Sequence, residues 1–509
     1  MISSIITLSK SVLLRFFLLG LALAFSQEPF NIPYCTFLVL PLITYLVIRF
    51  LKTSKQHLLS GLVFGLGYFG LTFIWIINPF LVEPQKNIWL APFAYALFVL
   101  SLSLFWALAF YLSNYLMRDE EDINKKVFCL SIFFAIAELL RCYLFSGFPW
   151  AILSYAWLDT PVSIFVTWMG PYIFNSIIII VGFNLFYSAI PVDIFKAIFL
   201  LTVLFGLHNK YSDNGFGEVS EHLTVRLVQP NIKQRDKWKK DNELSHLEIL
   251  MNLSNKSPKP DLVVWPETAV YWLPEENPDK LKMIAERLRS PLIFGALRFN
   301  RDTQELFNAV FLTDGEGNIQ DIYDKTFLVP FGEYQPLGGL LRYFNVFSNS
   351  YRFIDGFSSG TGLELIRNSG VPSFLPLICY EALFSNEILG KVKEAQWILN
   401  ITNDAWFGDG AGPKQHLNIA RMRALENNIP LIRVSNNGIS AKISQNGNVE
   451  KYIALNKKDF LDVKLGLNAK RENTLYANMG KNVSSYIHLM LLLLPLLYYS
   501  IFNKRKKGE

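Results

Sequence analysis

The uneven distribution of apolar residues constrains this chain more than any other feature of its sequence. Residues 1–207 are mostly hydrophobic, residues 209–484 have a mixed, globular composition, and residues 485–503 are apolar again. The 509 residues are 51% hydrophobic with a mean hydropathy of +0.26, which is too apolar for an ordinary soluble enzyme. We therefore expect membrane helices over 1–208, an extracytoplasmic domain over 209–484, and a last helix with a basic tail over 485–509.

Apolar runs long enough to cross a membrane predict eight helices. A span needs about 20 apolar residues. The expected spans are Ser11–Ser26, Pro33–Phe50, Gly61–Ile77, Trp89–Met117, Val127–Phe145, Gly170–Ile190, Ile194–Leu207 and Tyr486–Phe502. The Gly170-Pro171 pair is expected to break or begin the sixth helix. The first run has an alternative interpretation as a signal peptide, with basic Lys10 and Arg15 and Ala24-Phe-Ser26 as its cleavage site.

Basic residues between the expected spans predict their orientation. The basic positions are Arg49, Lys52 and Lys55 after the second span, Arg118, Lys125 and Lys126 after the fourth, and Lys504-Arg-Lys-Lys507 after the eighth. Basic loops stay on the cytoplasmic side. Eight spans then place both termini inside and residues 209–484 on the other side. The net charge of +6 is scattered without a basic-aromatic stripe, so we expect no nucleic-acid partner.

Two groups of residues in the apolar region call for an explanation. Glu138 and Arg141 lie three residues apart inside the fifth expected span, where charges are costly, so the pair is a candidate for a site or for packing. Trp150, Trp157 and Trp168 lie between the fifth and sixth spans. They are interpreted either as interfacial anchors or as part of a lipid entrance.

The cysteines are distributed unevenly between these regions. Cys35, Cys129 and Cys142 fall in expected membrane segments, and Cys379 is the one cysteine of residues 209–484. A lone cysteine there has no internal disulfide partner, which fits either a reactive thiol or a buried, inert one. The sequence has no Cys/His spacing typical of zinc sites, so we expect no metal and no cofactor.

Residues 209–484 alternate between strand-like and helix-like segments. The expected strands are Leu223–Val228, Leu262–Trp265, Leu292–Gly295, Phe307–Thr313, Ile319–Tyr323, Phe374–Cys379, Trp397–Thr402, Leu431–Ser435 and Ser440–Ser444. The expected helices are Leu244–Asn252, Leu281–Leu288, Ala382–Lys391 and His416–Glu426. Strands that alternate with helices, together with hairpin turns, indicate an α/β layered sheet or sandwich.

Three charged residues lie at the ends of strand-like segments. Glu267 follows Trp265-Pro266, which ends an apolar strand, and a carboxylate at such an edge can act as a general base. Lys325 can lower the pKa of a nearby thiol and stabilise an oxyanion. Glu333 can hold Lys325 in place or supply a second carboxylate. Taken alone, each of these residues has the simpler interpretation of a solvated surface group.

Cys379 is the expected nucleophile, at a strand-to-helix corner that exposes its side chain and directs backbone N–H groups at a substrate oxygen. We expect a low thiol pKa and therefore fast alkylation at neutral pH. A Cys379–His416 dyad is an alternative, but packing within a helix is the favoured interpretation of His416.

The order Glu267, Lys325, Cys379 resembles the nitrilase superfamily, whose α-β-β-α sandwich carries such a triad. Longer fragments resemble the apolipoprotein N-acyltransferases within it. These fragments are Val228-Gln-Pro-Asn-Ile232 with Trp238, Trp265-Pro-Glu267, Phe307-Asn308, Leu328–Tyr334, Ile378-Cys-Tyr-Glu381, Asn403-Asp-Ala-Trp-Phe-Gly408, Ala420–Glu426, Asn436-Asn-Gly438, Glu138-Leu-Leu-Arg141 and Gly147-Phe-Pro-Trp150. The likeness covers nearly the whole chain.

This resemblance implies an acyltransferase that works in two steps. Cys379 attacks a phospholipid acyl ester, and the acyl group then passes to the α-amine of a diacylglyceryl-cysteine at the N-terminus of an apolipoprotein. Glu267 would move the proton and Lys325 would stabilise the intermediates. The resemblance also implies an inner membrane with a periplasmic catalytic domain, and we expect a monomer. Its other implied site residues are Glu333, Asn308, Tyr380 and Glu381 as support, and Trp238, Trp406, Trp150 and Lys414 near the substrate.

Two positions depart from the family pattern. Phe327 stands where a His is usual, which suggests that this position is not essential to the chemistry. Lys414 stands where an aromatic residue is common after Gly412-Pro413. A lysine there puts loop contact with the substrate in doubt and is expected to favour anionic headgroups.

Two other functions remain open from the sequence. A membrane-anchored nitrilase-type amidase or hydrolase would use the same triad with water as the acceptor. An inactive membrane binding protein would use residues 209–484 as a scaffold, although the intact set of Glu267, Lys325 and Cys379 argues against it.

Overall fold

The computed structural model describes residues 9–187, 193, 196–197, 200, 221–336, 356–368, 370–467, 472–481, 484, 486 and 490. The chain folds as two compact units. Unit 1 comprises Met1–Asn214, Gly410–Asn418 and Met479–Glu509, and unit 2 comprises Gly215–Asp409 and Ile419–Asn478. A short segment from the globular part of the sequence, Gly410–Asn418, thus belongs to the apolar unit.

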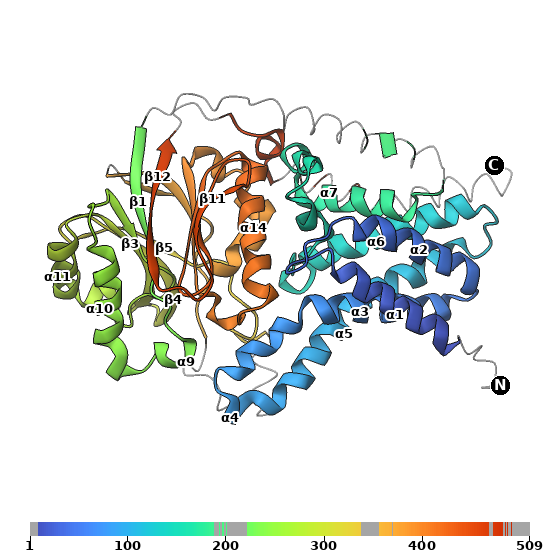
Figure 1. The fold of residues 1–509 in the computed structure, drawn as a ribbon, viewed down its shortest axis with the longest axis horizontal. Coiled ribbons are helices and arrows are strands. Elements are labelled where there is room, and N and C mark those ends of the chain that lie inside the picture. The colour runs from blue at the N-terminus through green and yellow to red at the C-terminus, as the bar shows by residue number, and fades with distance from the viewer. Residues whose placement is uncertain are drawn as a thin grey trace. The chain divides into compact units, whose positions relative to one another are not determined.

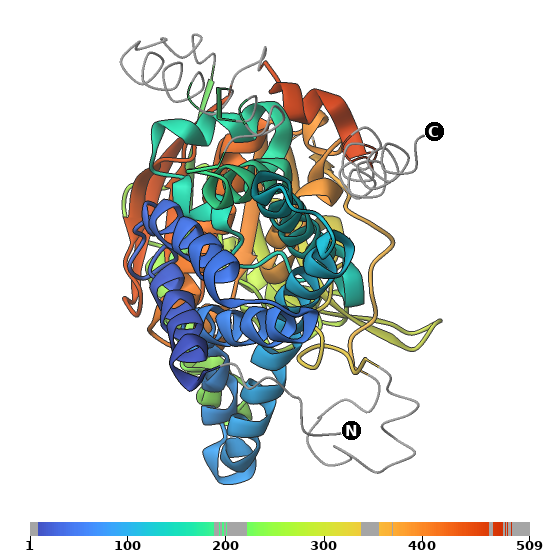
Figure 2. The same cartoon turned by 90° about the vertical axis from the view of Figure 1, so that its right-hand side faces the viewer.

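The helices of unit 1 contact one another in the order α1-α3-α5-α6-α7-α2, and α2 returns to α1 (Figure 2, blue to teal). Their bounds are α1 (Lys10–Ala24), α2 (Cys35–Phe50), α3 (Ser54–Thr72), η1 (Ile74–Leu81), α4 (Pro84–Asn87), η2 (Ile88–Leu90), α5 (Ala91–Met117), α6 (Ile123–Tyr143), η3 (Leu144–Ser146), η4 (Leu153–Trp157), η5 (Pro161–Ile164) and α7 (Phe165–Phe183). Small residues allow close approach: a Cβ on Gly20 of α1 would lie 2.2 Å from the carbonyl oxygen of Phe64 in α3.

Within the described residues, three helical segments are long and apolar enough to cross a membrane: Pro84–Met117, Ile123–Ser146 and Pro161–Phe183. A fourth results if Ser54–Thr72 and Ile74–Leu81, bent by 50°, form one span. Helices α1 and α2 also match expected spans but have only 15 and 16 residues. The structure therefore supports fewer than the eight spans predicted. The expected spans Ile194–Leu207 and Tyr486–Phe502, and the basic tail, lie largely or wholly outside the described residues.

The Gly170-Pro171 pair interrupts α7, as the sequence predicted. Gly170 has φ 77° and ψ 172°, a conformation that L-residues with a Cβ rarely adopt. Pro171 lacks the N–H that would continue the helical hydrogen bonds.

Glu138 and Arg141 form a buried ion pair on α6. Arg141 Nη2 donates to Glu138 Oε2 at 2.7 Å, and each side chain is 1% exposed. Trp106 Nε1 on α5 donates to Glu138 Oε1 at 2.8 Å. Arg141 Nη1 donates to the carbonyl oxygens of Phe148 and Trp150, at 2.7 and 2.9 Å. Of the two interpretations left open by the sequence, these contacts favour packing, because the pair fixes the loop after α6.

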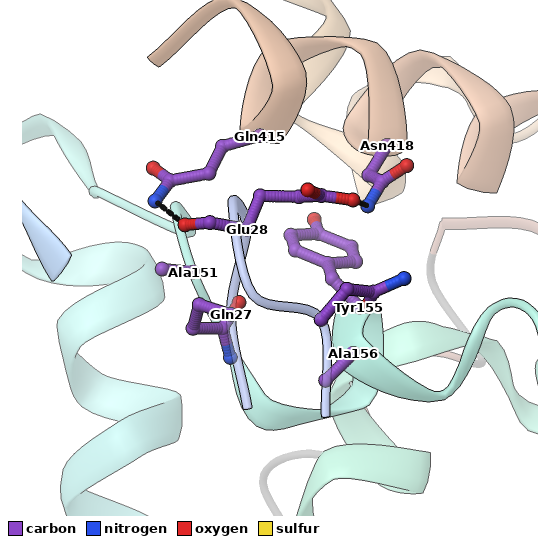
Figure 3. Close-up of a pocket in the computed structure, with 8 residues that line it drawn as sticks. Gln27, Glu28, Ala151, Tyr155, Ala156, Gln415 and Asn418 are labelled. Carbon is purple, nitrogen blue, oxygen red and sulfur yellow. Dashed lines mark hydrogen bonds between the residues drawn. The ribbon is translucent and has the colours of Figure 1, made fainter. Parts of the chain in front are cut away.

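Trp150 and Trp157 are buried, at 2% and 3% exposure, so they are not lipid-exposed anchors in this structure. Trp150 Nε1 donates to Gln415 Oε1 at 2.8 Å, and Trp75 Nε1 donates to the same oxygen at 3.0 Å. Figure 3 shows Gln415 and Asn418 of α14 (Ala411–Asn427) reaching Glu28 beside a small pocket in unit 1. The ring of His416 packs 5.3 Å from that of Trp150, in agreement with the packing interpretation of His416.

Within the described residues of unit 2, the strands form two six-stranded sheets with orders β12-β1-β2-β3-β4-β5 and β11-β10-β9-β8-β7-β6 (Figure 1). The strands are β1 (Glu221–Gln229), β2 (Leu262–Val264), β3 (Leu292–Asn300), β4 (Glu305–Thr313), β5 (Ile319–Asp324), β6 (Ile366–Asn368), β7 (Val371–Ile378), β8 (Trp397–Thr402), β9 (Leu431–Ser435), β10 (Ser440–Ile443), β11 (Val449–Ile453) and β12 (Asp459–Leu467). All nine strands expected from the sequence are present, and β6, β11 and β12 are additional.

Parallel pairing places the reactive ends of several strands together. Strands β1, β2 and β3 are parallel, and so are β7, β8 and β9. Parallel neighbours need crossover connections. Helices α10 (Glu243–Ser254) and α11 (Pro278–Leu288) supply them in the first sheet and pack on it through a buried apolar cluster. Helix α14 connects β8 to β9 in the second sheet. The result is the predicted α/β sandwich.

One predicted helix, Ala382–Lys391, is wrong. The segment contains η8 (Cys379–Leu383) and the short α13 (Ser385–Ile388), followed by Gly390 at φ 87° and then η9 (Val392–Glu394). Ser385 Oγ donates to Glu426 Oε1 at 2.7 Å, and Asn386 Oδ1 accepts from the Tyr476 hydroxyl at 3.0 Å. These tertiary hydrogen bonds favour a compact, broken connection over a continuous helix.

Candidate active site

Glu267 lies three residues beyond β2, and its backbone packs closely against β3. Gly295 of β3 has no side chain, and a Cβ there would lie 2.6 Å from the Cα of Glu267. The backbone N–H of Gly295 donates to the carbonyl oxygen of Pro266 at 3.1 Å. The Glu267 side chain is 8% exposed. Glycine in β3 therefore lets the carboxylate approach the centre of the unit.

Lys325 follows β5 and meets two carboxylates. Its Nζ lies 2.8 Å from Glu333 Oε1 and 3.5 Å from Glu267 Oε1. Asn308 of β4 lies beside this group, and its Nδ2 donates to the same two oxygens, at 2.7 Å for Glu267 and 3.3 Å for Glu333. Burial opposes the charge of Lys325, but Glu333 and Glu267 outweigh that effect and raise the pKa of its ammonium. Lys325 is therefore held as a cation.

Cys379 comes directly after β7 with a φ of 49°, which is unusual for a residue with a side chain. Such strain is typical of nucleophiles held at sharp strand-to-helix turns. The residue is buried, at 7% exposure. The strained turn gives Cys379 a fixed position at the carboxyl end of β7 in the second sheet, while Glu267 follows the carboxyl end of β2 in the first sheet.

The predicted low pKa of Cys379 is wrong. Burial raises the pKa of the thiol, the negative charge of Glu267 raises it further, and the Lys325 ammonium lowers it only in part. The prediction considered the lysine alone, and burial outweighs its favourable charge. Cys379 is therefore a thiol at rest and needs a base that accepts its proton.

Glu381 ties the ends of β5 and β7 together. Its Oε1 accepts from the Tyr323 hydroxyl at 2.7 Å and from the backbone N–H of Thr326 at 2.7 Å, and its Oε2 accepts from the N–H of Ile378 at 2.7 Å. Burial raises the pKa of this carboxyl to about 7, although the N–H of Ile378 lowers it. The side chain is fully buried, so it fixes the Lys325 loop against the residue that precedes Cys379.

The aromatic residues of the predicted set lie in different places. Tyr380 is 6% exposed, and its ring packs 5.2 Å from that of Phe384, which also stacks on Phe327 at 4.6 Å. Trp238 is half-buried with its ring 5.7 Å from that of Tyr271, and Trp406 is 40% exposed. Trp150 and Lys414 belong to unit 1, where Trp150 is buried and Lys414 is exposed.

Most of the predicted polar residues come together at one place in unit 2. Hydrogen bonds and ion pairs join Glu267, Asn308, Lys325 and Glu333, and Cys379 interacts electrostatically with Glu267 and Lys325. Sequence reasoning missed Lys237, whose Nζ donates to the backbone carbonyl of Glu267 at 3.0 Å. Its position next to Trp238 was the one available signal. Within the part of the chain that the structure describes, no group of acidic, histidine and cysteine side chains is arranged to hold a metal ion.

This arrangement can support acyl transfer through a covalent thioester. It offers a fixed thiol, a carboxylate that can accept its proton, and a cation to stabilise an oxyanion. The same three groups also suit hydrolysis, so the choice of acceptor is not determined by the triad.

Comparison with known proteins assigns both parts of the chain. Residues 19–184 match the apolipoprotein N-acyltransferase N-terminal domain, and residues 224–467 match the carbon-nitrogen hydrolase family. A CN-hydrolase superfamily protein of known structure from Xanthomonas campestris is 18% identical, covering 49% of this chain and 91% of that chain with a TM-score of 0.35.

Curated relatives match over most of their length. The apolipoprotein N-acyltransferase of Brucella suis is 31% identical over 474 residues, which cover 88% of each chain. That of Rhodopseudomonas palustris is 31% identical over 523 residues, covering 97% of this chain and 95% of the relative. By this identity and coverage, the chain belongs to the apolipoprotein N-acyltransferase family.

Proposed function

We propose that this chain transfers a fatty acyl group from a phospholipid to the α-amine of the N-terminal S-diacylglyceryl-cysteine of apolipoproteins, through a thioester on Cys379. The observation that carries the proposal is the buried group of Glu267, Lys325 and Glu333, which acts on the strained Cys379. Membership of the acyltransferase family supports the amine as acceptor.

In the first half-reaction, Glu267 accepts the thiol proton of Cys379, and the sulfur attacks the carbonyl carbon of the acyl ester. The resulting oxyanion is stabilised by Lys325 and by backbone N–H groups after Cys379. The C–O bond then breaks, the acyl group stays on sulfur, and Glu267 returns the proton to the leaving lysophospholipid alkoxide. The raised pKa of Cys379 makes this base necessary.

In the second half-reaction, the neutral α-amine attacks the thioester carbon and Glu267 accepts a proton from the nitrogen. The C–S bond breaks, the amide is formed, and the Cys379 thiolate regains the proton from Glu267. Glu333 keeps Lys325 in place in each half through the 2.8 Å contact. Excluding water from the site favours the amine over hydrolysis.

The membrane context is also part of the proposal. The apolar helices of unit 1 support a membrane-bound enzyme, and we extend this to eight spans, an inner-membrane location and a periplasmic catalytic domain. We also propose that the enzyme acts as a monomer and that Trp238 and Trp406 of unit 2 lie near the lipid substrates. Trp150 is buried and supports Gln415, the neighbour of Lys414.

The thioester can be tested by intact-protein mass spectrometry of the purified full-length chain after incubation with phospholipid alone. We expect an added acyl mass that is absent from the Cys379→Ala control and is discharged by a diacylated lipopeptide. An adduct discharged only by water would favour the hydrolase. A folded wild-type protein without any adduct would contradict the thioester route and favour the inactive scaffold.

Lys414 offers a test of donor preference. It is exposed on the first turn of α14, while its neighbour Gln415 is buried against Trp75 and Trp150. Lys414→Trp should therefore leave the turn intact and remove a surface cation. We expect the preference for anionic over zwitterionic donors to fall about fivefold, as for about 1 kcal/mol per basic residue at an anionic surface. The donor preference is measured as the ratio of acylation rates when anionic and zwitterionic phospholipids compete in one vesicle, and Lys451→Trp is the control. An unchanged ratio in Lys414→Trp would refute the role of Lys414 in donor preference.

A further inference from the structure

A chain of buried amides fixes the loop that precedes Trp238. Asn403, just beyond β8, donates through Nδ2 to Gln234 Oε1 at 2.7 Å. Asn436, just beyond β9, donates through Nδ2 to Asn403 Oδ1 at 2.9 Å, and its own Oδ1 accepts from the N–H of Ile232 at 3.1 Å. The short helix α9 (Gln234–Lys237) is thus held against the carboxyl ends of two parallel strands.

This loop buries the ammonium group of Lys237. The residue is 2% exposed, although lysine is rarely buried unless it is paired. Of the residues that the structure describes, only the carbonyl oxygen of Glu267 accepts a hydrogen bond from Nζ, at 3.0 Å. The charged and titratable groups that act on it are Glu267 and Cys379, and it acts in turn on His246 of α10. Lys237 therefore faces the base and the nucleophile.

Lys237 offsets part of the net negative charge of the site. Lys325 lies beside two carboxylates, 2.8 Å from Glu333 and 3.5 Å from Glu267. Those three groups sum to one negative charge when all are ionised. A thiolate on Cys379 that forms while Glu267 stays ionised, as in alkylation, adds a second negative charge in a buried site, where like charges are costly. Lys237 supplies a compensating positive charge.

We propose that Lys237 is a positioning residue of the acyl-transfer site, which holds the backbone of Glu267 and supplies a positive charge that stabilises negative charge on the Cys379 sulfur. The inference rests on the proposed function, because it assigns Glu267 and Cys379 the roles of base and nucleophile.

The charge of Lys237 depends on pH within the working range. Burial lowers the pKa of its ammonium to about 8, against the opposing effects of Glu267 and Cys379. The cation is therefore present below pH 8 and is lost as the pH rises above it. The stabilisation of the Cys379 thiolate by Lys237 should therefore also be present below pH 8 and be lost above it.

The test is the rate at which iodoacetamide alkylates Cys379 from pH 6 to 10, followed by mass spectrometry of the peptide that contains it. The full-length protein is compared with Lys237→Gln, Lys237→Met and Lys237→Arg. We expect the Gln and Met variants to be alkylated about tenfold more slowly than wild type below pH 8, because loss of the cation raises the pKa of the Cys379 thiol and lowers the thiolate fraction. The difference should shrink above pH 8. Arg, which keeps the charge, should remain within about threefold of wild type.

The Gln variant removes the charge and keeps an N–H donor, whereas the Met variant has nearly the length of lysine and keeps neither the charge nor a donor. A Lys237→Gln profile that superimposes on wild type would overturn the inference. The control Lys239→Gln removes an equal charge from a side chain that is 59% exposed, and it should leave the alkylation rate of Cys379 unchanged. If the Gln and Met variants fail to fold, the comparison of wild type with Lys237→Arg decides. The Arg variant must then match the wild-type alkylation rate of Cys379 below pH 8 and exceed it above pH 8. Absence of any wild-type acyl adduct would instead refute the proposed function.

Discussion

Glu267→Gln is expected to slow acylation of Cys379 by about 10²–10⁴-fold, the range for loss of a general base. The amide keeps the size of the side chain, and its oxygen can still accept from Asn308 Nδ2, which lies 2.7 Å from Glu267 Oε1. It cannot accept the thiol proton. Single-turnover formation of the acyl adduct, measured by mass spectrometry with a phospholipid donor, checks this rate.

The same variant should change alkylation in the opposite direction. The negative charge of Glu267 raises the pKa of the Cys379 thiol, so its removal should lower that pKa and speed reaction with iodoacetamide at neutral pH. If Glu267→Gln is alkylated faster but acylated more slowly than wild type, the loss of activity comes from proton transfer and not from a less reactive thiol. Unfolding would also expose the thiol and stop acyl transfer, so the variant must unfold at the same temperature as wild type for this conclusion.

Glu286→Gln serves as the control, because it makes the same substitution on the exposed side of α11. Its acylation and alkylation rates should equal those of wild type. Acylation of Glu267→Gln at the wild-type rate would show that another group accepts the proton.

Strand ends were predictable from the sequence because apolar runs in parallel strands have sharp limits. Leu262–Val264 and Phe374–Ile378 are buried and are soon followed by chemically active residues. This pattern by itself predicts that Glu267 and Cys379 lie at the carboxyl ends of strands. The additional strands β11 and β12 are more polar, and edge strands of this kind give only a weak periodic signal.

Burial of polar groups could not be predicted in the same way. Lys237 lies in a run of charged residues that is typical of a solvated surface, and only the tertiary contact with Glu267 distinguishes it. The pKa of Cys379 was mispredicted for the same reason, because burial depends on residues far away in sequence. Glu138 and Arg141 were recognisable as a pair from their spacing, but their partners in the following loop were not.

Arg141→Met is expected to lower the free energy of unfolding by about 3–5 kcal/mol, the cost of leaving a buried charge without its partner. Glu138 would keep the hydrogen bond from Trp106 but lose two from Arg141, at 3.0 and 2.7 Å. The carbonyl oxygens of Phe148 and Trp150 would also lose their donor. Thermal unfolding of the purified protein in detergent, followed by tryptophan fluorescence, measures the loss.

The double variant Glu138→Leu with Arg141→Met tests the cause. Removing both charges leaves no unpaired ion, so this protein should be more stable than Arg141→Met alone. Arg141→Lys keeps the charge but not the planar donor set, and should fall between wild type and Arg141→Met. A double variant that is less stable than Arg141→Met would mean that Glu138, through its hydrogen bond from Trp106, stabilises the helices by more than its burial without a partner costs. In either case we expect Trp150 to move when Arg141 is lost, because Arg141 holds its carbonyl oxygen. The hydrogen bond from Trp150 to Gln415 should then weaken.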